Sequence, residues 1–401
     1  MRIAYVNYGH QSGVTPNLTR ALSTLGHEIL SVDPTQVLAL RNQRTRLPRP
    51  TPRVLLSIAV SALQHGPQLM HHRWNTVYAF DQHTRSASQL LRGVQADVVL
   101  QNGALFAPGR PAPLPYVLLL DNTCRLAERQ PPVPEADIGP HIAFGAAWLK
   151  RERDTYQRAA AIATFSELVR GSLIDEYGVD PERVHVVGAG ANIVPAGEPA
   201  HQDDGQTLVF VGKDGWRRKG GPVMLEAFTR LRRQRPSLRL YLAGPPDDLA
   251  VPEGVTNLGL VPFAEVEKLL ARATLFVLPT LREPFGIAYI DAMIHEVPCI
   301  GTLVGAVPEI IGDAGLCVPP ADAGALASAI AELLDDPPRR AAMGAAGRRR
   351  VLERGYLWPD VARKLTALLH RAISGDTIRN ACQPGIRGHD TQFVPTSSLS
   401  G

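Results

Sequence analysis

The stretch "TLFVLPTLREPFGIAYIDAM", from Thr274 to Met293, joins a short apolar run to a loop that carries Glu283 and then to a second acid, Asp291. The run "TLFVLPT" is uninterrupted by charge, which predicts a strand buried on both faces of a parallel sheet. The loop "LREPFG" then lies at the carboxyl end of that strand, where open α/β sheets bind ligands. The stretch therefore predicts a ligand site in a parallel α/β fold.

The residues around Gly286 indicate what kind of ligand would fit. Glycine lets the backbone approach a ligand closely, and the helix that begins there directs free NH groups toward a negative group. Carboxylates on either side, Glu283 and Asp291, can accept hydrogen bonds from hydroxyl groups. A nucleoside diphosphate sugar has this order of groups: sugar, diphosphate and ribose.

Short apolar runs alternate with helical periodicity along almost the whole chain, which is the βαβ pattern. Between Gly188 and Gly205 the composition changes to glycine, proline and aspartate, and the pattern then restarts. This change predicts a domain boundary. We therefore predict an α/β protein built from two Rossmann-like domains in tandem.

The expected domains are an N-terminal Rossmann-like domain that binds the acceptor and a C-terminal Rossmann-like domain that binds the donor, followed by a helix and a flexible tail. Their predicted ranges are 1–195, 196–355, 356–373 and 374–401. The tail has no hydrophobic periodicity, which is why we expect it to be flexible. The helix is expected to cross back to the first domain.

A dinucleotide enzyme is the first alternative for two Rossmann-like domains. The segment "VVGAGANI" follows a predicted strand, and Gly188 and Gly190 fit the first two glycines of the fingerprint. Ile193 stands where the third residue must be small for helix and strand to pack closely. The fingerprint therefore fails.

Composition excludes several other classes. Apolar residues make up 45% and charged residues 20% of the 401 residues, as in an ordinary globular protein. The net charge of +4 is too small to indicate nucleic acid. Four scattered cysteines without a CxxC pair indicate neither a zinc site nor a disulfide framework. The start "MRIAYVNY" lacks the features of a signal peptide, so we expect a cytoplasmic protein.

One basic segment stands out, "RNQRTRLPRPTPR" from Arg41 to Arg53, ahead of the apolar run "VLLSIAVSAL". A solvated basic loop is one interpretation. The other is a surface that docks on anionic lipid or an anionic acceptor, since basic residues add about 1 kcal/mol each near an acidic membrane. The segment thus predicts a peripheral contact with the inner face of a membrane.

A second loop supplies positive charge for the predicted site. The segment "VFVGKDGWRRKGG" follows the first strand of the second domain and carries Lys213 and Lys219 with two arginines. A lysine beside a Gly-Gly helix start predicts a clamp for a diphosphate, although a solvated basic loop would have the same composition.

Together these motifs resemble the retaining nucleotide-sugar glycosyltransferases of family four, whose GT-B fold has two Rossmann-like domains facing each other across a cleft. The resemblance extends to about Ile373 and includes "FVGKDGWRRKGG", "REPFGIAYIDAM" and "CIGTLVGAVPEII". It implies that a hexose-type sugar passes from a nucleoside diphosphate sugar to an acceptor hydroxyl with retained configuration. The leaving phosphate itself would take the acceptor proton.

The resemblance also implies roles for individual residues. The first acid of the E-x7-E motif, here Glu283, would bind the donor sugar, and the second, here Asp291, would bind the ribose. Lys213 and Lys219 would stabilise the departing diphosphate as catalytic groups. Three consecutive backbone amides would meet the sugar and phosphate, those of Phe285, Gly286 and Ile287.

In the first domain the resemblance places Gly13 against the donor phosphates and makes Asp121 a contact to sugar or acceptor. His10 is the residue that an inverting enzyme of this fold would use as its general base, so inversion is an alternative. The sequence contains no Asp-x-Asp triplet to hold a catalytic metal. We therefore expect no cofactor and no dependence on metal.

Three departures from the family pattern leave a further alternative open. Asp291 replaces the usual glutamate, Lys213 replaces the usual arginine, and Gly305-Ala306 replaces a Gly-Gly pair. These changes would also suit a catalytically weak protein that binds a nucleotide sugar. The base is expected to be held largely by backbone, so side chains do not separate UDP, GDP and ADP donors, and the acceptor is not identified.

Overall fold

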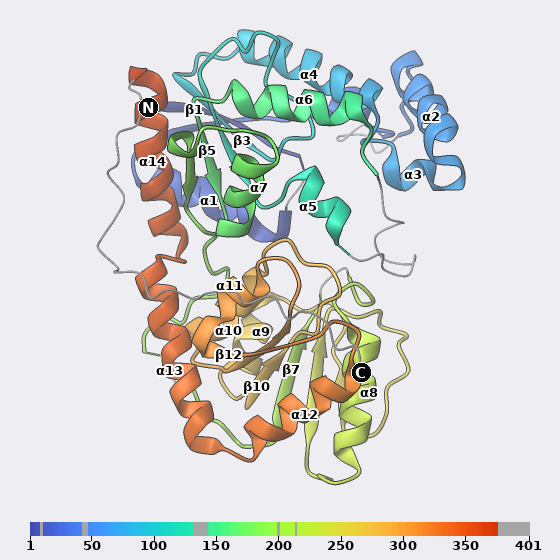
Figure 1. Cartoon of the computed structure of the whole chain (residues 1–401), viewed down its shortest axis with the longest axis vertical. Helices are drawn as coiled ribbons and strands as arrows, with labels where there is room; N and C mark the ends of the chain where they lie inside the picture. Colours follow the sequence, from blue (N-terminus) through green and yellow to red (C-terminus); the bar gives the residue numbers. More distant parts are fainter. Residues whose placement is uncertain (9–10, 42–46, 131–142, 199–200, 213–214, 376–401) are drawn as a thin grey trace, which may run out of the picture.

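The computed structural model describes residues 1–8, 11–41, 47–130, 143–198, 201–212 and 215–375. These residues form two parallel sheets of six strands each, one in each of two lobes that lie end to end (Figure 1). The predicted α/β fold is therefore confirmed. His10 and Lys213 lie outside the described residues.

The first sheet has the strand order β2-β1-β3-β4-β5-β6, with every pair parallel. Its strands are β1 (Arg2–Val6), β2 (Glu28–Val32), β3 (Val98–Asn102), β4 (Tyr116–Leu120), β5 (Ala161–Thr164) and β6 (Val184–Val186). Every residue of β3, β4 and β5 is buried, as expected of central strands covered on both faces.

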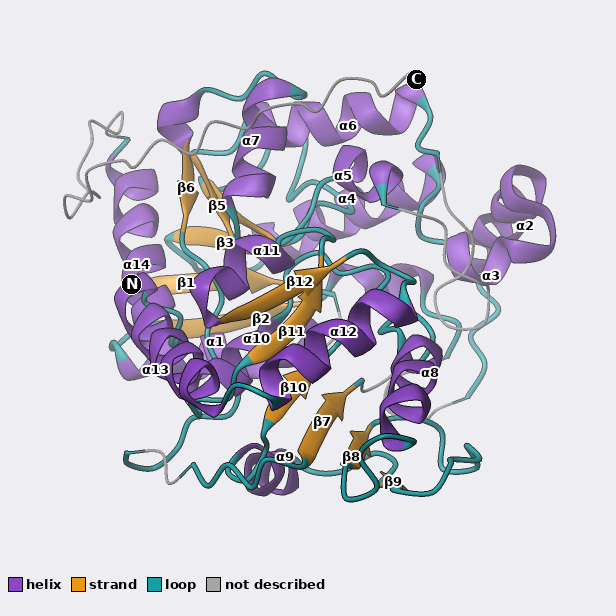
Figure 2. Cartoon of the chain, turned by 60° about the horizontal axis from the view of Figure 1, so that its bottom comes forward, coloured by secondary structure: helices purple, strands orange, loops and turns teal. Residues whose placement is uncertain are grey.

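The second sheet has the order β12-β11-β10-β7-β8-β9 and is also parallel throughout. Its strands are β7 (Thr207–Val211), β8 (Arg239–Ala243), β9 (Val255–Asn257), β10 (Leu275–Val277), β11 (Cys299–Thr302) and β12 (Gly315–Val318). The chain proceeds from β7 to β8 and β9, then crosses to the other side of β7 to form β10 (Figure 2). The order thus reverses between β7 and β10.

Helices cover both sheets. Those of the first lobe are α1 (Val14–Thr24), α2 (Pro52–His65), α3 (Leu69–His72), α4 (Val77–Arg92), α5 (Cys124–Arg129), α6 (Ala146–Gln157) and α7 (Glu167–Asp175). Those of the second are α8 (Gly221–Arg232), α9 (Phe263–Leu270), α10 (Ile287–Ile294), α11 (Val307–Ile311), α12 (Ala323–Leu334) and α13 (Pro337–Arg354). Leu18 and Leu22 of α1, four residues apart and therefore on one face of the helix, are fully buried.

The last helix, α14 (Trp358–Ser374), returns from the second lobe to the first and packs against α1 (Figure 1). Lys364 on α14 donates to the backbone oxygen of Val187 at 3.1 Å, and His27 meets Thr366 at 2.9 Å. Helix α14 thus contacts both lobes.

Candidate functional site

The candidate site lies at the carboxyl edge of the second sheet, where the strand order reverses. In open α/β sheets the loops on either side of such a reversal leave in opposite directions, and ligands bind in the crevice between them. The loop after β7 carries Lys219 and the loop after β10 carries Glu283. The two predicted residues are thus brought to one place although they are 64 positions apart.

Lys219 and Glu283 form a buried ion pair in which the ammonium donates to the carboxylate. Their side chains are 13% and 9% exposed, and Arg218 Nη1 lies 3.9 Å from the same carboxylate oxygen. Burial lowers the pKa of Lys219, and the nearby charge of Glu283 opposes that shift. Two cations therefore converge on one anion at this edge of the sheet.

The backbone that follows Glu283 is shaped by Gly286. This residue caps α10 with φ of 113°, and a Cβ atom there would lie 2.7 Å from the ring of Tyr289. Only glycine fits, because the left-handed conformation and the contact both exclude a side chain. Phe285 is 3% exposed and packs edge-on against Phe165 of the first lobe, with ring centroids 5.3 Å apart. Ile287 is half-buried at the first position of the helix.

The loop after β11 packs against the backbone of Glu283. Gly305 has φ of 55°, and a Cβ atom there would lie 1.9 Å from the carbonyl oxygen of Glu283. The next residue, Ala306, has φ of −87°, a conformation open to any residue, and its NH donates to Pro284 O at 3.3 Å. The alanine in place of the family's second glycine is therefore accommodated by the backbone.

Asp291 makes an unexpected contact. One oxygen of its carboxylate accepts the backbone NH groups of Asn192, at 2.6 Å, and Ile193, at 3.1 Å. The residue is 7% exposed. Burial raises its pKa to about 7, against the effect of the two NH groups. In this structure Asp291 therefore binds the segment between the two sheets.

Asn192 extends this contact into the first lobe. Its side-chain oxygen accepts from Asn17 at 2.8 Å and from the indole NH of Trp358 at 3.3 Å, and its amide donates to Ser12 O at 2.9 Å. Gly13 has φ of 86°, and a Cβ atom there would lie 2.8 Å from the Asn192 oxygen. The predicted glycine of the first lobe, Gly13, thus packs against the side chain of Asn192, and the backbone NH of Asn192 donates to Asp291.

Asp121 follows β4 at the junction of the lobes. Its side chain is open to solvent, but many protein atoms surround it. The resulting loss of hydration and the negative charge of Glu283 raise the pKa of Asp121. The pKa of Asp121 therefore depends in part on the charge of Glu283.

Two further residues bridge the lobes and were not assigned from the sequence. Arg282 donates to Gln130 Oε1 at 2.9 Å, and Glu309 accepts the backbone NH groups of Glu167 at 2.9 Å and Leu168 at 3.3 Å. Both lie in stretches that were quoted as motifs, "REPFG" and "PEII". Partners more than 100 positions away left no signal in the sequence.

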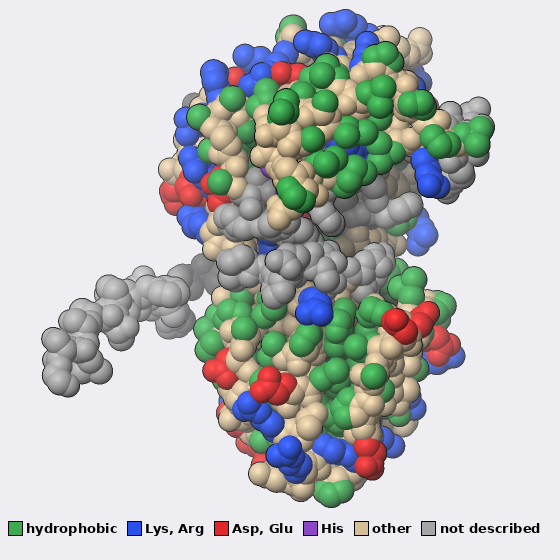
Figure 3. Space-filling model, turned by 90° about the vertical axis from the view of Figure 1, so that its right-hand side faces the viewer, with side chains coloured by type: hydrophobic (Ala, Val, Ile, Leu, Met, Phe, Trp, Pro, Cys, Tyr) green, Lys and Arg blue, Asp and Glu red, His purple; other side chains and the backbone are tan. Residues whose placement is uncertain are grey.

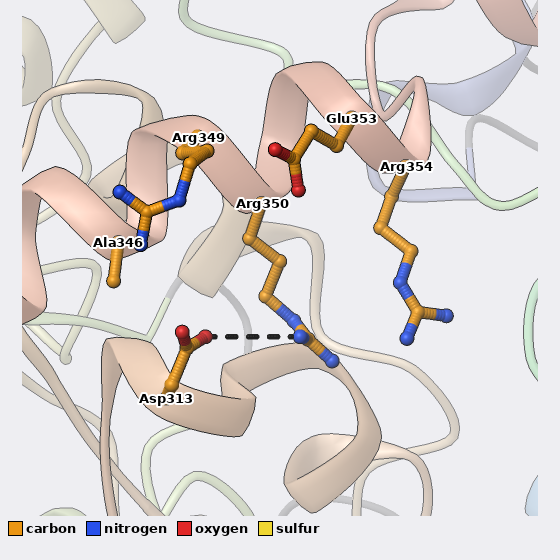
Figure 4. A pocket seen from close by; sticks show the side chains of 6 residues that line it. All are labelled: Asp313, Ala346, Arg349, Arg350, Glu353 and Arg354. Carbon is orange, nitrogen blue, oxygen red and sulfur yellow. Dashed lines mark ion pairs between the residues drawn. The ribbon is translucent and has the colours of Figure 1, made fainter. Parts of the chain in front are cut away.

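Other features of the described chain lie apart from this site. A pocket of about 100 Å³ on α13 is lined by Asp313, Ala346, Arg349, Arg350, Glu353 and Arg354 (Figure 4). Arg350 points toward Asp313, whose carboxylate lies 3.7 Å away. The described residues contain no cluster of three or more potential metal ligands. Nor does any helix among them have the length and apolar character needed to span a membrane.

Solved structures with a similar fold cover nearly the whole chain. Sucrose-phosphate synthase from Thermosynechococcus elongatus matches 94% of this chain and 100% of its own, with a TM-score of 0.67 and 18% identity. WaaG, a glycosyltransferase involved in lipopolysaccharide biosynthesis, matches 92% of this chain and 99% of its own, with a TM-score of 0.62 and 16% identity. The fold is thus of the GT-B class.

Sequence comparison finds a family match within the second lobe. Residues 205–336, which include Lys219, Glu283 and Asp291, match the model described as "Glycosyl transferases group 1". The chain is 27% identical over 249 residues to an MMP alpha-(1->4)-mannosyltransferase of Mycolicibacterium hassiacum, covering 59% of this chain and 60% of the relative. Residues 205–336 are therefore similar to the group 1, or family four, glycosyltransferases.

A second relative is more similar over a shorter region. It is a GDP-mannose-dependent monoacylated alpha-(1-6)-phosphatidylinositol monomannoside mannosyltransferase of Corynebacterium glutamicum, 34% identical over 168 residues. The match covers 38% of this chain and 44% of the relative. The matched regions thus span between about two fifths and three fifths of these relatives' length.

Proposed function

We propose that the protein is a glycosyltransferase that moves a hexose-type sugar from a nucleoside diphosphate sugar to an acceptor hydroxyl, with retention of configuration. The observation that carries this proposal is the buried pair of Lys219 and Glu283 at the reversal point of the second sheet. Its place inside the region that matches the family model supports it.

In this proposal the positive groups hold the diphosphate. Lys219 and Lys213 interact with its oxygens, and the amides of Phe285, Gly286 and Ile287 at the start of α10 contact phosphate and sugar. When the bond from the sugar carbon to the diphosphate oxygen breaks, negative charge grows on the leaving group. A fixed cation stabilises that charge more than the ground state, and loss of one such group costs about 3 to 4 kcal/mol of activation energy.

Glu283 positions the donor sugar. Its carboxylate accepts hydrogen bonds from sugar hydroxyls while the ion pair with Lys219 orients it. Asp291 binds the ribose hydroxyls, which requires its carboxylate to exchange one or both backbone partners for the ligand or to use its second oxygen. Gly13 lies against the donor phosphates, and Asp121 and His10 contact the sugar or acceptor.

The transfer step balances without a protein nucleophile. The acceptor oxygen forms a bond to the sugar carbon on the face from which the diphosphate leaves, and the acceptor proton passes to the departing phosphate oxygen. We propose that no metal takes part, because the sequence lacks an Asp-x-Asp triplet. Activity should then persist in excess chelator.

The acceptor is proposed as a hydroxyl compound of a glycan, lipid or small metabolite. One relative is named for a phosphatidylinositol mannoside acceptor, which makes a lipid-linked hydroxyl a reasonable first substrate to supply. With the basic segment from Arg41 to Arg53, this relative supports a protein that works in the cytoplasm at the inner face of a membrane.

The test is product analysis by NMR with a panel of nucleotide sugars and candidate acceptors. The proposal predicts release of the nucleoside diphosphate and a new glycosidic bond whose anomeric configuration is that of the donor. An inverted product would instead favour His10 as general base. Binding of a nucleotide sugar without turnover, for every acceptor tried, would favour a catalytically weak binding protein.

A further inference from the structure

Helix α2 (Pro52–His65) projects from the side of the first lobe, away from the candidate site (Figure 1 and Figure 2). A helix at a protein surface normally packs its apolar face inward and turns its polar face outward. In α2 this relation is reversed. Ser57 and Ser61 are 0% exposed, whereas Leu55, Leu56 and Leu63 are 55%, 49% and 88% exposed.

Hydrogen bonds hold the helix in this orientation. Ser57 Oγ donates to Val54 O at 2.8 Å, and Ser61 Oγ donates to Leu69 O, at the start of α3, also at 2.8 Å. Rotation of α2 to bury its leucines would therefore expose Val54 and break the bond from Ser61 to the neighbouring helix. The outward leucines are a stable feature of the lobe.

The outward residues form one continuous face. At 100° per residue, the positions of Leu55, Leu56 and Leu63 project to the same side of the helix, and the exposed Ala59 lies between them. Met70 of α3 is 53% exposed next to this helix. Figure 3 shows hydrophobic side chains gathered on the first lobe in the view that faces its projecting side.

Positive charge borders this face. The sequence from Pro34 to Phe80 contains six arginines, one of which, Arg73, is buried, and no aspartate or glutamate, although the chain has 38 acids. Arg41, Arg49 and Arg53 are exposed, and no carboxylate of the described residues pairs with them. An apolar face with an unneutralised basic border matches the chemistry of an anionic membrane surface.

We propose that the outward face of α2, bordered by Arg49 and Arg53, docks on a bilayer that contains anionic phospholipid. The helix would lie in the plane of the interface with its leucines among the upper acyl chains and its arginines at the lipid phosphates. A second copy of this chain fits less well, because a two-fold contact through α2 would bring like charges together. The inference goes beyond the proposed reaction and does not depend on it.

Vesicle flotation without nucleotide tests this inference directly. Wild-type protein should float with vesicles of equal parts phosphatidylglycerol and phosphatidylcholine and stay behind with phosphatidylcholine alone. Leu55→Ser with Leu56→Ser should lower partitioning at least about tenfold, because two leucines lose their apolar environment. Arg49→Gln with Arg53→Gln should lower it by about twenty-five-fold, at about fivefold for each arginine.

Matched variants separate this face from the rest of the surface. Leu352 of α13 is 49% exposed, like Leu56, and Leu352→Ser should float as the wild type does. Arg20 of α1 is exposed, and Arg20→Gln should also leave flotation unchanged. Circular dichroism establishes that each variant is folded.

Three results would overturn the inference. The first is wild-type protein that does not float with anionic vesicles. The second is a Leu55→Ser and Leu56→Ser variant that floats as well as the wild type. The third is a dimer in sedimentation velocity that this variant dissociates, since a second copy would then occupy the face. Nucleotide binding, measured separately, reports on the proposed transferase and not on this surface.

Discussion

The carboxylate of Asp291 accepts the backbone NH of Asn192 at 2.6 Å, so a residue of the second sheet's α10 holds the segment that joins the two lobes. Asn192 in turn contacts Ser12 and Asn17 of the first lobe. Asp291, the residue proposed to bind ribose, is therefore also a contact between the lobes. Binding of a ligand at Asp291 and the relative position of the lobes should be coupled, because both use the same carboxylate.

This contact makes stability depend on pH in a defined direction. Burial raises the pKa of Asp291 to about 7, so the folded protein binds a proton at pH values where the unfolded chain, with a pKa of about 3.9, is ionised. This contribution to stability is complete below about pH 4 and is lost as the pH rises through about 7. Asp291→Asn should remove it.

The measurement is urea unfolding of wild type and Asp291→Asn at pH 5 and pH 8. The free energy of unfolding of the variant, relative to wild type, should increase by about 3 kcal/mol between the two pH values. The exposed Asp248→Asn serves as control and should show no such change. Equal differences at both pH values would show that Asp291 does not titrate in this range.

A buried histidine should have the opposite effect. His83 is 0% exposed, both of its ring nitrogens lack hydrogen-bond partners among the described residues, and burial lowers its pKa to about 4. The unfolded chain binds a proton near pH 6.5, whereas the folded protein does not, so stability falls as the pH drops from about 6.5 toward 4. Acid therefore destabilises the protein through His83.

His83→Phe keeps a ring between Trp74 and Phe106 while it removes the titration. Relative to wild type, the variant should gain about 2 kcal/mol in free energy of unfolding between pH 7 and pH 5. His370, which is exposed on α14, provides the control His370→Gln. A relative stability that does not change with pH would rule out this role for His83.

Gly305 should be required for the shape of the loop that carries Glu283. Gly305→Ala would place a Cβ atom 1.9 Å from the carbonyl oxygen of Glu283 in addition to straining a backbone with φ of 55°. Gly26 has φ of 81° and no atom within 4 Å of an added Cβ, so Gly26→Ala has the strain without the contact.

We expect Gly26→Ala to cost about 1 kcal/mol of stability and to leave nucleotide affinity unchanged. Gly305→Ala should cost more and should weaken nucleotide affinity at least about tenfold, because Glu283 and its loop must move. Calorimetric titration and thermal unfolding of both variants measure the two effects. Identical behaviour of the two variants would contradict this account of the loop.

Glu283→Gln should separate binding from transfer. The substitution removes the negative charge beside Lys219 and Arg218, so a nucleoside diphosphate should bind at least as tightly as to the wild type. The hydroxyl groups of the donor sugar lose a charged hydrogen-bond acceptor, and the transfer rate should fall about a hundredfold or more. The exposed Glu265→Gln is the control, and a Glu283→Gln enzyme with unchanged turnover would be the contrary result.

The fold was predictable from local patterns, and so was the place of the candidate site within it. Charge-free strands such as "TLFVLPT" and loops that follow them report directly on a parallel sheet and its carboxyl edge. Lys219 and Glu283 meet because their loops flank the reversal of strand order. The repeated βαβ pattern predicts a fold with such a reversal.

The sequence did not predict contacts whose partners are far away in the chain, or residues that can bind more than one kind of group. A carboxylate at Asp291 suits a ribose hydroxyl or a backbone NH equally well, and its partner Asn192 is 99 positions away. The orientation of α2 was hidden for a different reason. Its run of apolar residues does not show which side of the helix faces inward, and only the packed lobe shows that Ser57 and Ser61 do.

The central claim is that Lys219 and its neighbours form a diphosphate site. Calorimetric titration with nucleoside diphosphates and the corresponding monophosphates of uridine, guanosine and adenosine tests it, using wild type, Lys219→Ala and the exposed control Lys268→Ala. The account predicts that for one base the wild type and the control bind the diphosphate at least about tenfold more tightly than the monophosphate, and that Lys219→Ala loses this preference. A preference that survives in Lys219→Ala, or is absent from the wild type for every base, would contradict it.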